Sequence, residues 1–135
     1  MSLDPYGRSE LHYAPQHKPE AEQAALAERL IAEGCEIDQQ DSLGWTPLHF
    51  AAQEWSWPVA SVLIAKGALV DVKDRHGNTP LSKAVFNSRG RGDLIKLLLD
   101  AGADPDSENA HGMSPRGLAE TIANFNVKQH IPAKA

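Results

Sequence analysis

The chain has 135 residues, of which 41% are hydrophobic, and a formal net charge of −5 at pH 7. Its mean hydropathy is −0.40, and no stretch approaches the roughly 20 consecutive apolar residues of a membrane-spanning helix. The N-terminus has no charged segment followed by an apolar one, so we expect no signal peptide and a cytoplasmic location. A single cysteine excludes an intrachain disulfide. These features predict one globular domain that does not bind membranes.

The negative charge is concentrated in the first half of the chain. Residues 1–71 hold 11 acidic and 4 basic side chains, whereas residues 72–135 hold 7 acidic and 9 basic ones. Phosphate backbones are bound by clustered Lys and Arg, so this balance argues against a nucleic-acid partner. An acidic half suits a basic protein partner, whose approach it would accelerate. A solvated surface without a partner explains the same balance equally well.

A pattern of about 33 residues recurs along the chain. The clearest copy is Asp41–Ala52, which reads DSLGWTPLHFAA. Asp74–Ala84 repeats it 33 residues later, Asn109–Ala119 follows after another 35, and Asp4–Ala14 lies 37 residues upstream. Each copy places a glycine in a turn and then a Ser or Thr that can cap a helix. In three copies proline follows at the first helical position, where its missing N–H costs little.

Thr-Pro-Leu-His-x-Ala after a glycine turn is the signature of the ankyrin repeat, and the chain resembles that family over nearly its full length. The resemblance implies an all-α ankyrin-repeat solenoid of four helix–turn–helix repeats with short β-hairpin fingers. We place a single ankyrin-repeat domain over residues 1–135. Its repeats are expected at about 4–40, 41–73, 74–108 and 109–131, and the first and last act as caps.

The expected helices follow from the caps, the glycines and the apolar spacing. Inner helices are expected at about 9–13, 46–54, 79–87 and 114–123. Outer helices are expected at about 19–33, 57–66 and 92–101, with a stub at 126–130 and a disordered tail at 131–135. Each full outer helix ends before a glycine. Leu30, Leu63 and Leu98 lie four residues before these glycines and predict a stacking core.

Several reactive or charged residues fall into structural slots. His12 and His49 occupy the motif's histidine position, which favours a hydrogen bond between repeats over catalysis or metal binding. Cys35 fills a small-residue slot and is expected to be a buried hydrophobe rather than a nucleophile. Arg116 replaces the motif's leucine, and we expect its charge to face water because it lies in a terminal cap.

No catalytic motif is present in the sequence, so we expect a protein that is not an enzyme and has no cofactor. The segment Arg89–Gly92 superficially resembles a phosphate-binding loop. It lacks a preceding strand and a following Gly-Lys-Ser/Thr, and an insertion between two helices explains it better. Six histidines are scattered over separate slots, which argues against a zinc site.

The resemblance implies protein binding through a concave face formed by the fingers and the inner helices. The candidate partner-binding residues are mainly aromatic or polar side chains at positions that the pattern leaves free to point outward. On the fingers they are Tyr6, Arg8, Leu43, Trp45, His76 and Asn78, and on the inner helices Tyr13, Phe50, Glu54, Lys83 and Asn87. Trp55 and Trp57 are added from the turn between two helices, where core packing and partner binding are equally good interpretations. One of them could fold back onto the insertions at residues 15–19 and 88–92.

Within the family, the chain resembles small, stand-alone bacterial ankyrin-repeat proteins. The segments that carry this resemblance are Gly44–Ala51, Ala84–Gly90 and Leu118–Asn124. Some such proteins are immunity proteins that bind and neutralise a cognate toxin, and this role is what the resemblance implies in its most concrete form. A basic toxin domain bound on the concave face would suit the acidic charge. An accessory or regulatory subunit of an enzyme, and a general protein-interaction adaptor, are the alternatives.

Overall fold

The computed structural model describes residues 2–122 and 126–133. Its helices in chain order are α1 (Glu10–Tyr13), α2 (Gln23–Ala32), α3 (Pro47–Gln53), α4 (Trp57–Ala65), α5 (Pro80–Phe86), α6 (Asp93–Asp100) and α7 (Pro115–Thr121). Short 3-10 helices are η1 (Ala14–Gln16), η2 (Glu20–Glu22) and η3 (Val127–His130). No β-strand occurs within these described ranges, and the expectation of an all-α ankyrin solenoid is confirmed.

The inner helices begin where the sequence places their caps. The Oγ1 atom of Thr46 accepts a hydrogen bond from the backbone N–H of His49, and Pro47 fills the first position of α3. Thr79 caps α5 and Ser114 caps α7 in the same way. Because each cap satisfies a free N–H at the helix start, helices of only seven residues can begin at a defined point.

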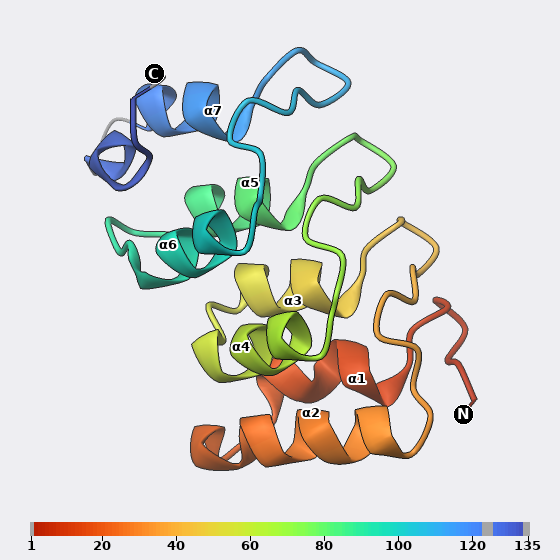
Figure 1. The fold of residues 1–135 in the computed structure, drawn as a ribbon. Helices are drawn as coiled ribbons and strands as arrows, with labels where there is room; N and C mark the ends of the chain where they lie inside the picture. Colours follow the sequence, from red (N-terminus) through yellow and green to blue (C-terminus); the bar gives the residue numbers. More distant parts are fainter. Residues whose placement is uncertain (1, 123–125, 134–135) are drawn as a thin grey trace.

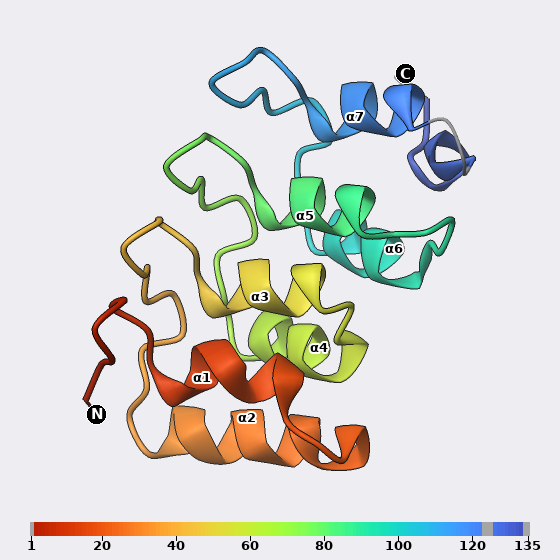
Figure 2. The same ribbon diagram turned by 180° about the vertical axis from the view of Figure 1, so that it is seen from behind.

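The helices pack as successive layers along one axis (Figures 1 and 2). The inner helices α1, α3, α5 and α7 contact one another in order, and so do the outer helices α2, α4 and α6. The outer-helix leucines Leu30, Leu63 and Leu98 are fully buried between them, which confirms the predicted stacking core. The 3-10 helix η3 packs against α7 in the last layer, where the other layers have an outer helix.

The four fingers, at residues 4–8, 41–45, 74–78 and 109–113, are hydrogen-bonded turns that project to one side of the helices (Figure 1). In the second finger the backbone N–H of Asp41 donates to the oxygen of Trp45 at 2.9 Å, and the other three fingers repeat this bond. Neighbouring fingers are joined by further backbone hydrogen bonds. The N–H of Ser42 donates to the backbone oxygen of Tyr6 at 2.7 Å, and the N–H of Arg75 donates to the backbone oxygen of Leu43 at 2.9 Å. The fingers therefore form a continuous edge without strands.

The C-terminal region differs from expectation at two points. The sequence predicts a disordered tail at residues 131–135, but Ile131 is buried with Val127 against the hydrophobic core. The prediction is wrong for this residue. Residues 134–135 of the same expected tail, and residue 123 of the expected inner helix, lie outside the described residues. The Arg116 side chain is less exposed to water than the sequence predicts. Its side chain is largely buried and its Nε atom donates to Asp106 Oδ1 at 2.8 Å, so an ion pair compensates the burial.

Candidate partner-binding groove

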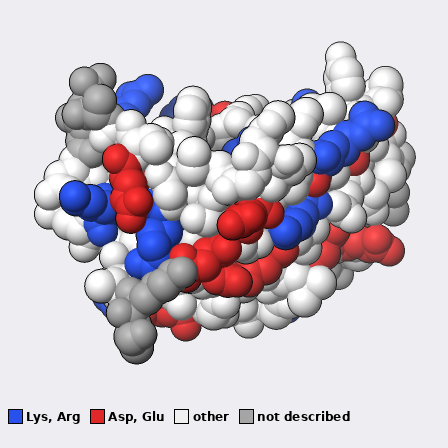
Figure 3. Space-filling view, turned by 90° about the horizontal axis from the view of Figure 1, so that it is seen from above, with Lys and Arg blue, Asp and Glu red and all other residues white. Residues whose placement is uncertain are grey.

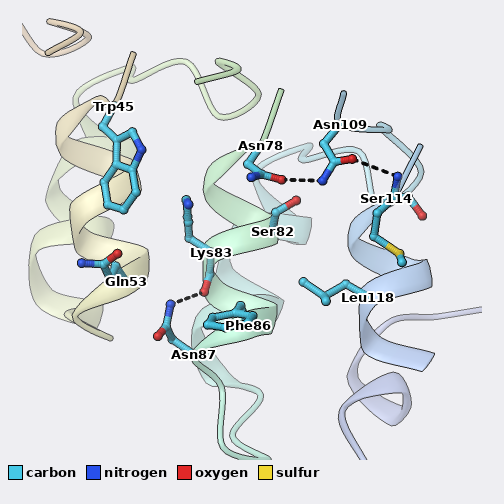
Figure 4. Close-up of a pocket in the computed structure, with 11 residues that line it drawn as sticks. Trp45, Gln53, Asn78, Ser82, Lys83, Phe86, Asn87, Asn109, Ser114 and Leu118 are labelled. Atoms are coloured by element: carbon cyan, nitrogen blue, oxygen red, sulfur yellow. Dashed lines mark hydrogen bonds between the residues drawn. The ribbon is translucent and has the colours of Figure 1, made fainter. Parts of the chain in front are cut away.

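A groove with a volume of about 350 Å³ lies on the side of the helices that faces the fingers. Residues of α3, α5, α7 and the fingers that precede these helices line it (Figure 4). The lining residues are Trp45, Gln53, Asn78, Ser82, Lys83, Phe86, Asn87, Asn109, Met113, Ser114 and Leu118. Four of the sequence-based candidates, Trp45, Asn78, Lys83 and Asn87, are brought together here.

Phe86 is the main apolar feature of the groove and is absent from the sequence-based candidates. It ends α5 and is 71% exposed, more than any other large hydrophobic side chain in the described residues. Phe86 lies 33 residues after Gln53, so it holds the slot in which the preceding repeat has a polar side chain. A phenylalanine in a solvent-facing slot is the signal that could have identified it. Leu118 of α7 lies across the groove from it (Figure 4).

Side-chain amides form much of the polar lining of the groove. The Nδ2 atom of Asn87, the residue that follows α5, donates to the backbone oxygen of Lys83 at 2.8 Å. The Nδ2 atom of Asn109 donates to Asn78 Oδ1 at 3.0 Å and so links the third and fourth fingers (Figure 4). These bonds hold two of the amides in place, and an immobilised amide loses little rotamer entropy when a partner binds it.

Lys83 is held between an aromatic ring and a buried carboxylate. Its Nζ atom lies 4.2 Å from the centre of the Trp45 ring and 3.7 Å from Asp74 Oδ2. The Asp74 side chain is fully buried, and its Oδ1 atom accepts the backbone N–H groups of His76 and Asn78. Among the described residues, its Oδ2 atom has no hydrogen-bond partner. The ion pair with Lys83 therefore provides the main compensation for this buried oxygen.

Phe50 does not point outward, so the expectation of an outward-pointing side chain at this position is wrong. The side chain is only 5% exposed. Neighbouring side chains cover it: the guanidinium of Arg8 lies 4.9 Å from its ring centre and the Trp45 ring lies 5.0 Å away. Arg8 is held over the ring because its Nε atom donates to the buried carboxylate of Asp41 at 3.0 Å. Phe50 and Arg8 thus belong to a packed cluster beside the groove.

The remaining concave-face candidates lie at the fingertips and on the first inner helix. Tyr6, Leu43 and His76 are exposed at the fingertips but do not line the groove. Tyr13 is half-buried, and its hydroxyl donates to Asp4. The pKa of the Asp4 carboxyl is lowered from its ordinary value, and this hydrogen bond is the largest cause of the shift.

The two tryptophans of the inter-helix turn lie apart from the groove. Trp55 is half-buried and folds onto the segment between α5 and α6, where Arg91 lies 4.3 Å from its ring centre. Its indole N–H donates to Asp93, the first residue of α6, at 3.0 Å. Its contact with the hydrophobic core favours the packing interpretation for this residue. Trp57, at the start of α4, is 43% exposed. Glu54 is exposed and accepts a hydrogen bond from Gln16 at 3.1 Å.

The buried histidines connect one repeat to the next, as predicted. His12 Nε2 lies 3.1 Å from the backbone oxygen of Trp45, and His49 Nε2 lies 2.9 Å from that of Asn78. Burial lowers the pKa of both imidazoles and is the largest cause of each shift. The pKa of His49 falls to about 4. Cys35 is buried, also as predicted. Over residues 2–122 and 126–133, no group of three or more His, Cys, Asp or Glu side chains could hold a metal ion.

The charges are unevenly distributed over the surface. Among the described residues that line the groove, Lys83 carries the one formal charge. Much of the acidic surplus of the first half instead surrounds the outer helix α2, where Glu20, Glu22, Glu28 and Glu33 are exposed. Figure 3 views the molecule from the α7 end and shows basic side chains beside acidic ones rather than in one basic field.

A family model described as "Ankyrin repeats (3 copies)" matches residues 11–109. The chain belongs to the ankyrin-repeat family. Ankyrin repeats are protein-binding modules, so this chain carries a protein-binding module. A search of curated proteins finds no match to this ankyrin-repeat chain. None of the helices in the described residues is long and apolar enough to span a membrane.

Proposed function

We propose that this ankyrin-repeat protein binds its partner at the concave groove and that Phe86 is the principal anchor. The exposure of Phe86 is the observation that carries the proposal, because burying a phenylalanine side chain contributes about 1.5–3 kcal/mol. The amides and Lys83 around it supply polar groups that orient a partner. The proposal includes partner contacts with four of the sequence-based candidates, Trp45, Asn78, Lys83 and Asn87.

In its most concrete form, the protein is a bacterial immunity protein that acts in the cytoplasm and neutralises a cognate toxin by covering it. Its resemblance to small, stand-alone bacterial ankyrin proteins and its net charge of −5 support this role. The acidic residues around α2 lie on the outer-helix side of the solenoid, so their field would speed the approach of a basic toxin domain rather than hold it in the groove. Neutralisation by occlusion requires no catalysis by this chain.

We further propose that residues 1–135 act as a single domain whose repeats span about 4–40, 41–73, 74–108 and 109–131. The 3-10 helix η3 and the ion pair of Arg116 with Asp106 cover the end of the stack, which supports a capping role for the last repeat.

The test is affinity capture from the native host with three tagged proteins: the wild type, Phe86→Ser and Leu69→Ser. Leu69 is the matched control because it is 62% exposed and lies outside the groove. We expect one stoichiometric partner on the wild type and on Leu69→Ser, and little on Phe86→Ser. The partner should be toxic when expressed alone and harmless when co-expressed with the wild type.

Two results would contradict parts of the proposal. Equal capture by Phe86→Ser would place the binding site outside the groove. Capture of a non-toxic metabolic enzyme would overturn the immunity role and favour an accessory or regulatory subunit, while a set of many weak partners would favour an adaptor.

A further inference from the structure

Three nitrogen donors face the same space at one end of the groove. Figure 4 shows the indole nitrogen of Trp45, the ammonium group of Lys83 and the amide nitrogen of Asn78 turned toward one another across it. All three residues line the groove. They come from different elements: Trp45 and Asn78 from successive fingers, and Lys83 from the middle of α5.

None of these three nitrogens donates a hydrogen bond within the described part of the chain, although Lys83 forms an ion pair. Lys83 Nζ has an ion-pair contact with Asp74 at 3.7 Å, which is too long for a hydrogen bond. Asn78 accepts a hydrogen bond through Oδ1, which leaves its Nδ2 group without an acceptor among the described residues. The Trp45 indole N–H likewise has no acceptor there. An ammonium offers three donors, an amide nitrogen two and an indole one, so this end of the groove can donate several hydrogen bonds to an acceptor-rich group.

The cation is the exposed member of the Lys83–Asp74 ion pair. Asp74 is fully buried behind Lys83, whereas the Lys83 side chain is 19% exposed. A carboxylate entering the groove would accept charge-assisted hydrogen bonds from Lys83 and neutral ones from Trp45 and Asn78. Lys83 would then bridge the buried carboxylate of Asp74 and the incoming one.

The other end of the groove holds two apolar side chains, Phe86 and Leu118, beside the amides of Gln53 and Asn87 (Figure 4). Phe86 and Leu118 lie on facing helices, α5 and α7, with an exposed ring on the α5 side (Figure 4). A phosphate group or a nucleic-acid backbone would leave this surface uncovered. A peptide with a large apolar side chain next to an acidic one would satisfy both ends.

We propose that the groove binds a segment of a partner protein in which an Asp or Glu side chain lies beside a large apolar side chain. The carboxylate binds Lys83, Trp45 and Asn78, and the apolar side chain packs on Phe86 and Leu118. This inference rests on the proposed function, since it specifies the partner's chemistry at the same groove. A predominantly basic partner can carry one such acidic segment.

The test uses a phage-displayed library of random 12-residue peptides selected against the full-length chain. We expect enriched peptides to share an acidic residue next to a large apolar one. A synthetic peptide from the enriched set is then titrated calorimetrically, together with its Asp→Asn or Glu→Gln version. Loss of the carboxylate should weaken binding by at least about 10-fold.

Protein variants locate the peptide in the groove. Lys83→Gln and Phe86→Ser should each weaken binding by at least about 10-fold. Lys96→Gln and Leu69→Ser should bind as the wild type does, because both residues are exposed outside the groove. Circular dichroism of each variant shows whether it is folded. If removal of Lys83 leaves Asp74 unpaired and disturbs the fold, Phe86→Ser still tests binding in the groove, because Phe86 is exposed.

The proposal is overturned if no peptide is enriched, if enriched peptides lack the carboxylate, or if Phe86→Ser binds them normally. These outcomes are distinct from failure of the proposed function. Host capture that depends on Phe86, combined with peptides that lack an acidic residue, would keep the groove as the binding site and reject the acidic segment.

Discussion

His49 binds the backbone oxygen of Asn78, 29 residues ahead and in the next finger, at 2.9 Å. The other ring nitrogen, Nδ1, accepts the backbone N–H of Thr46 at 3.1 Å. A nitrogen that accepts an N–H carries no proton, so the proton of neutral His49 must be on Nε2, where it donates to Asn78. The histidine thus joins a helix cap to the following repeat only in its neutral form.

This relationship predicts a loss of stability as pH falls from about 6.5 to about 4. The folded pKa of His49 is about 4, below its ordinary value of 6.5. The unfolded state therefore binds the proton more readily in this window, and protonation favours unfolding. The free energy of unfolding should decrease by about 3 kcal/mol from this residue, as measured by urea denaturation at several pH values. His12, whose pKa is also lowered, should act in the same direction.

A pair of substitutions isolates the effect of His49. His49→Gln should lower stability at pH 7 and make the pH dependence shallower between about 6.5 and about 4, because the buried titrating group is gone. His111→Gln, which removes an exposed histidine of the fourth finger, should leave the slope unchanged. An unchanged slope in His49→Gln would show that the buried imidazole does not control acid unfolding.

Two equivalent finger glycines should respond differently to alanine. Gly77 and Gly112 both have positive φ angles, +79° and +75°. A Cβ atom on Gly77 would lie 3.0 Å from the backbone of Asn109 and Ala110, whereas one on Gly112 would meet no atom of the described residues within 4 Å. Gly112→Ala should cost about 1–2 kcal/mol for the left-handed backbone. Gly77→Ala should cost a further 1–3 kcal/mol, roughly, because the adjacent finger must move.

Chemical denaturation of the two glycine variants checks this difference. Equal losses of unfolding free energy would mean that the contact between neighbouring fingers adjusts without cost.

Substitution of two phenylalanines on neighbouring inner helices should change the free energy of unfolding to very different extents. Phe50→Ala removes a buried ring from beneath Arg8 and Trp45 and should cost about 3–5 kcal/mol of unfolding free energy. Phe86→Ser changes a largely exposed side chain and should alter stability by no more than about 0.5 kcal/mol. Thermal unfolding of both variants measures the contrast, and comparable losses would mean that Phe86 is packed in solution.

The sequence pattern was sufficient to predict the parts of the fold that depend on local chemistry. Thr46, Thr79 and Ser114 act as caps because a hydroxyl followed by proline favours a helix start in any context. The role of His49 could be predicted because its slot in the repeat fixes its neighbour.

The orientation of side chains at the free positions could not be predicted in this way. Phe50 and Lys83 hold the same slot, yet Phe50 is buried because Arg8 and Trp45 cover it from other elements. For the two tryptophans, the sequence indicated that one of them could fold onto residues 88–92 but not which one, and it is Trp55 that contacts Arg91 and donates to Asp93. Such cover depends on which long side chains the neighbouring repeats supply, and the repeat pattern does not specify them.

Phe86 illustrates the opposite case. The repeat pattern treats the end of an inner helix as solvent-facing, and Gln53 follows that rule while Phe86 breaks it. An exposed apolar side chain contributes little to the stability of the isolated chain, and Phe86 differs from other exposed apolar residues because it lines the groove together with Leu118. The same violation of the pattern is what makes it the strongest candidate for a binding anchor.

The most direct test of the account is the affinity of the purified partner for the wild type, Phe86→Ser and Leu69→Ser, measured by isothermal titration calorimetry. Loss of a central aromatic anchor should weaken binding by about 2 kcal/mol or more, which is roughly 30-fold. Leu69→Ser should bind with wild-type affinity because Leu69 is exposed outside the groove. Wild-type affinity in Phe86→Ser would contradict the claim that the partner binds in the concave groove.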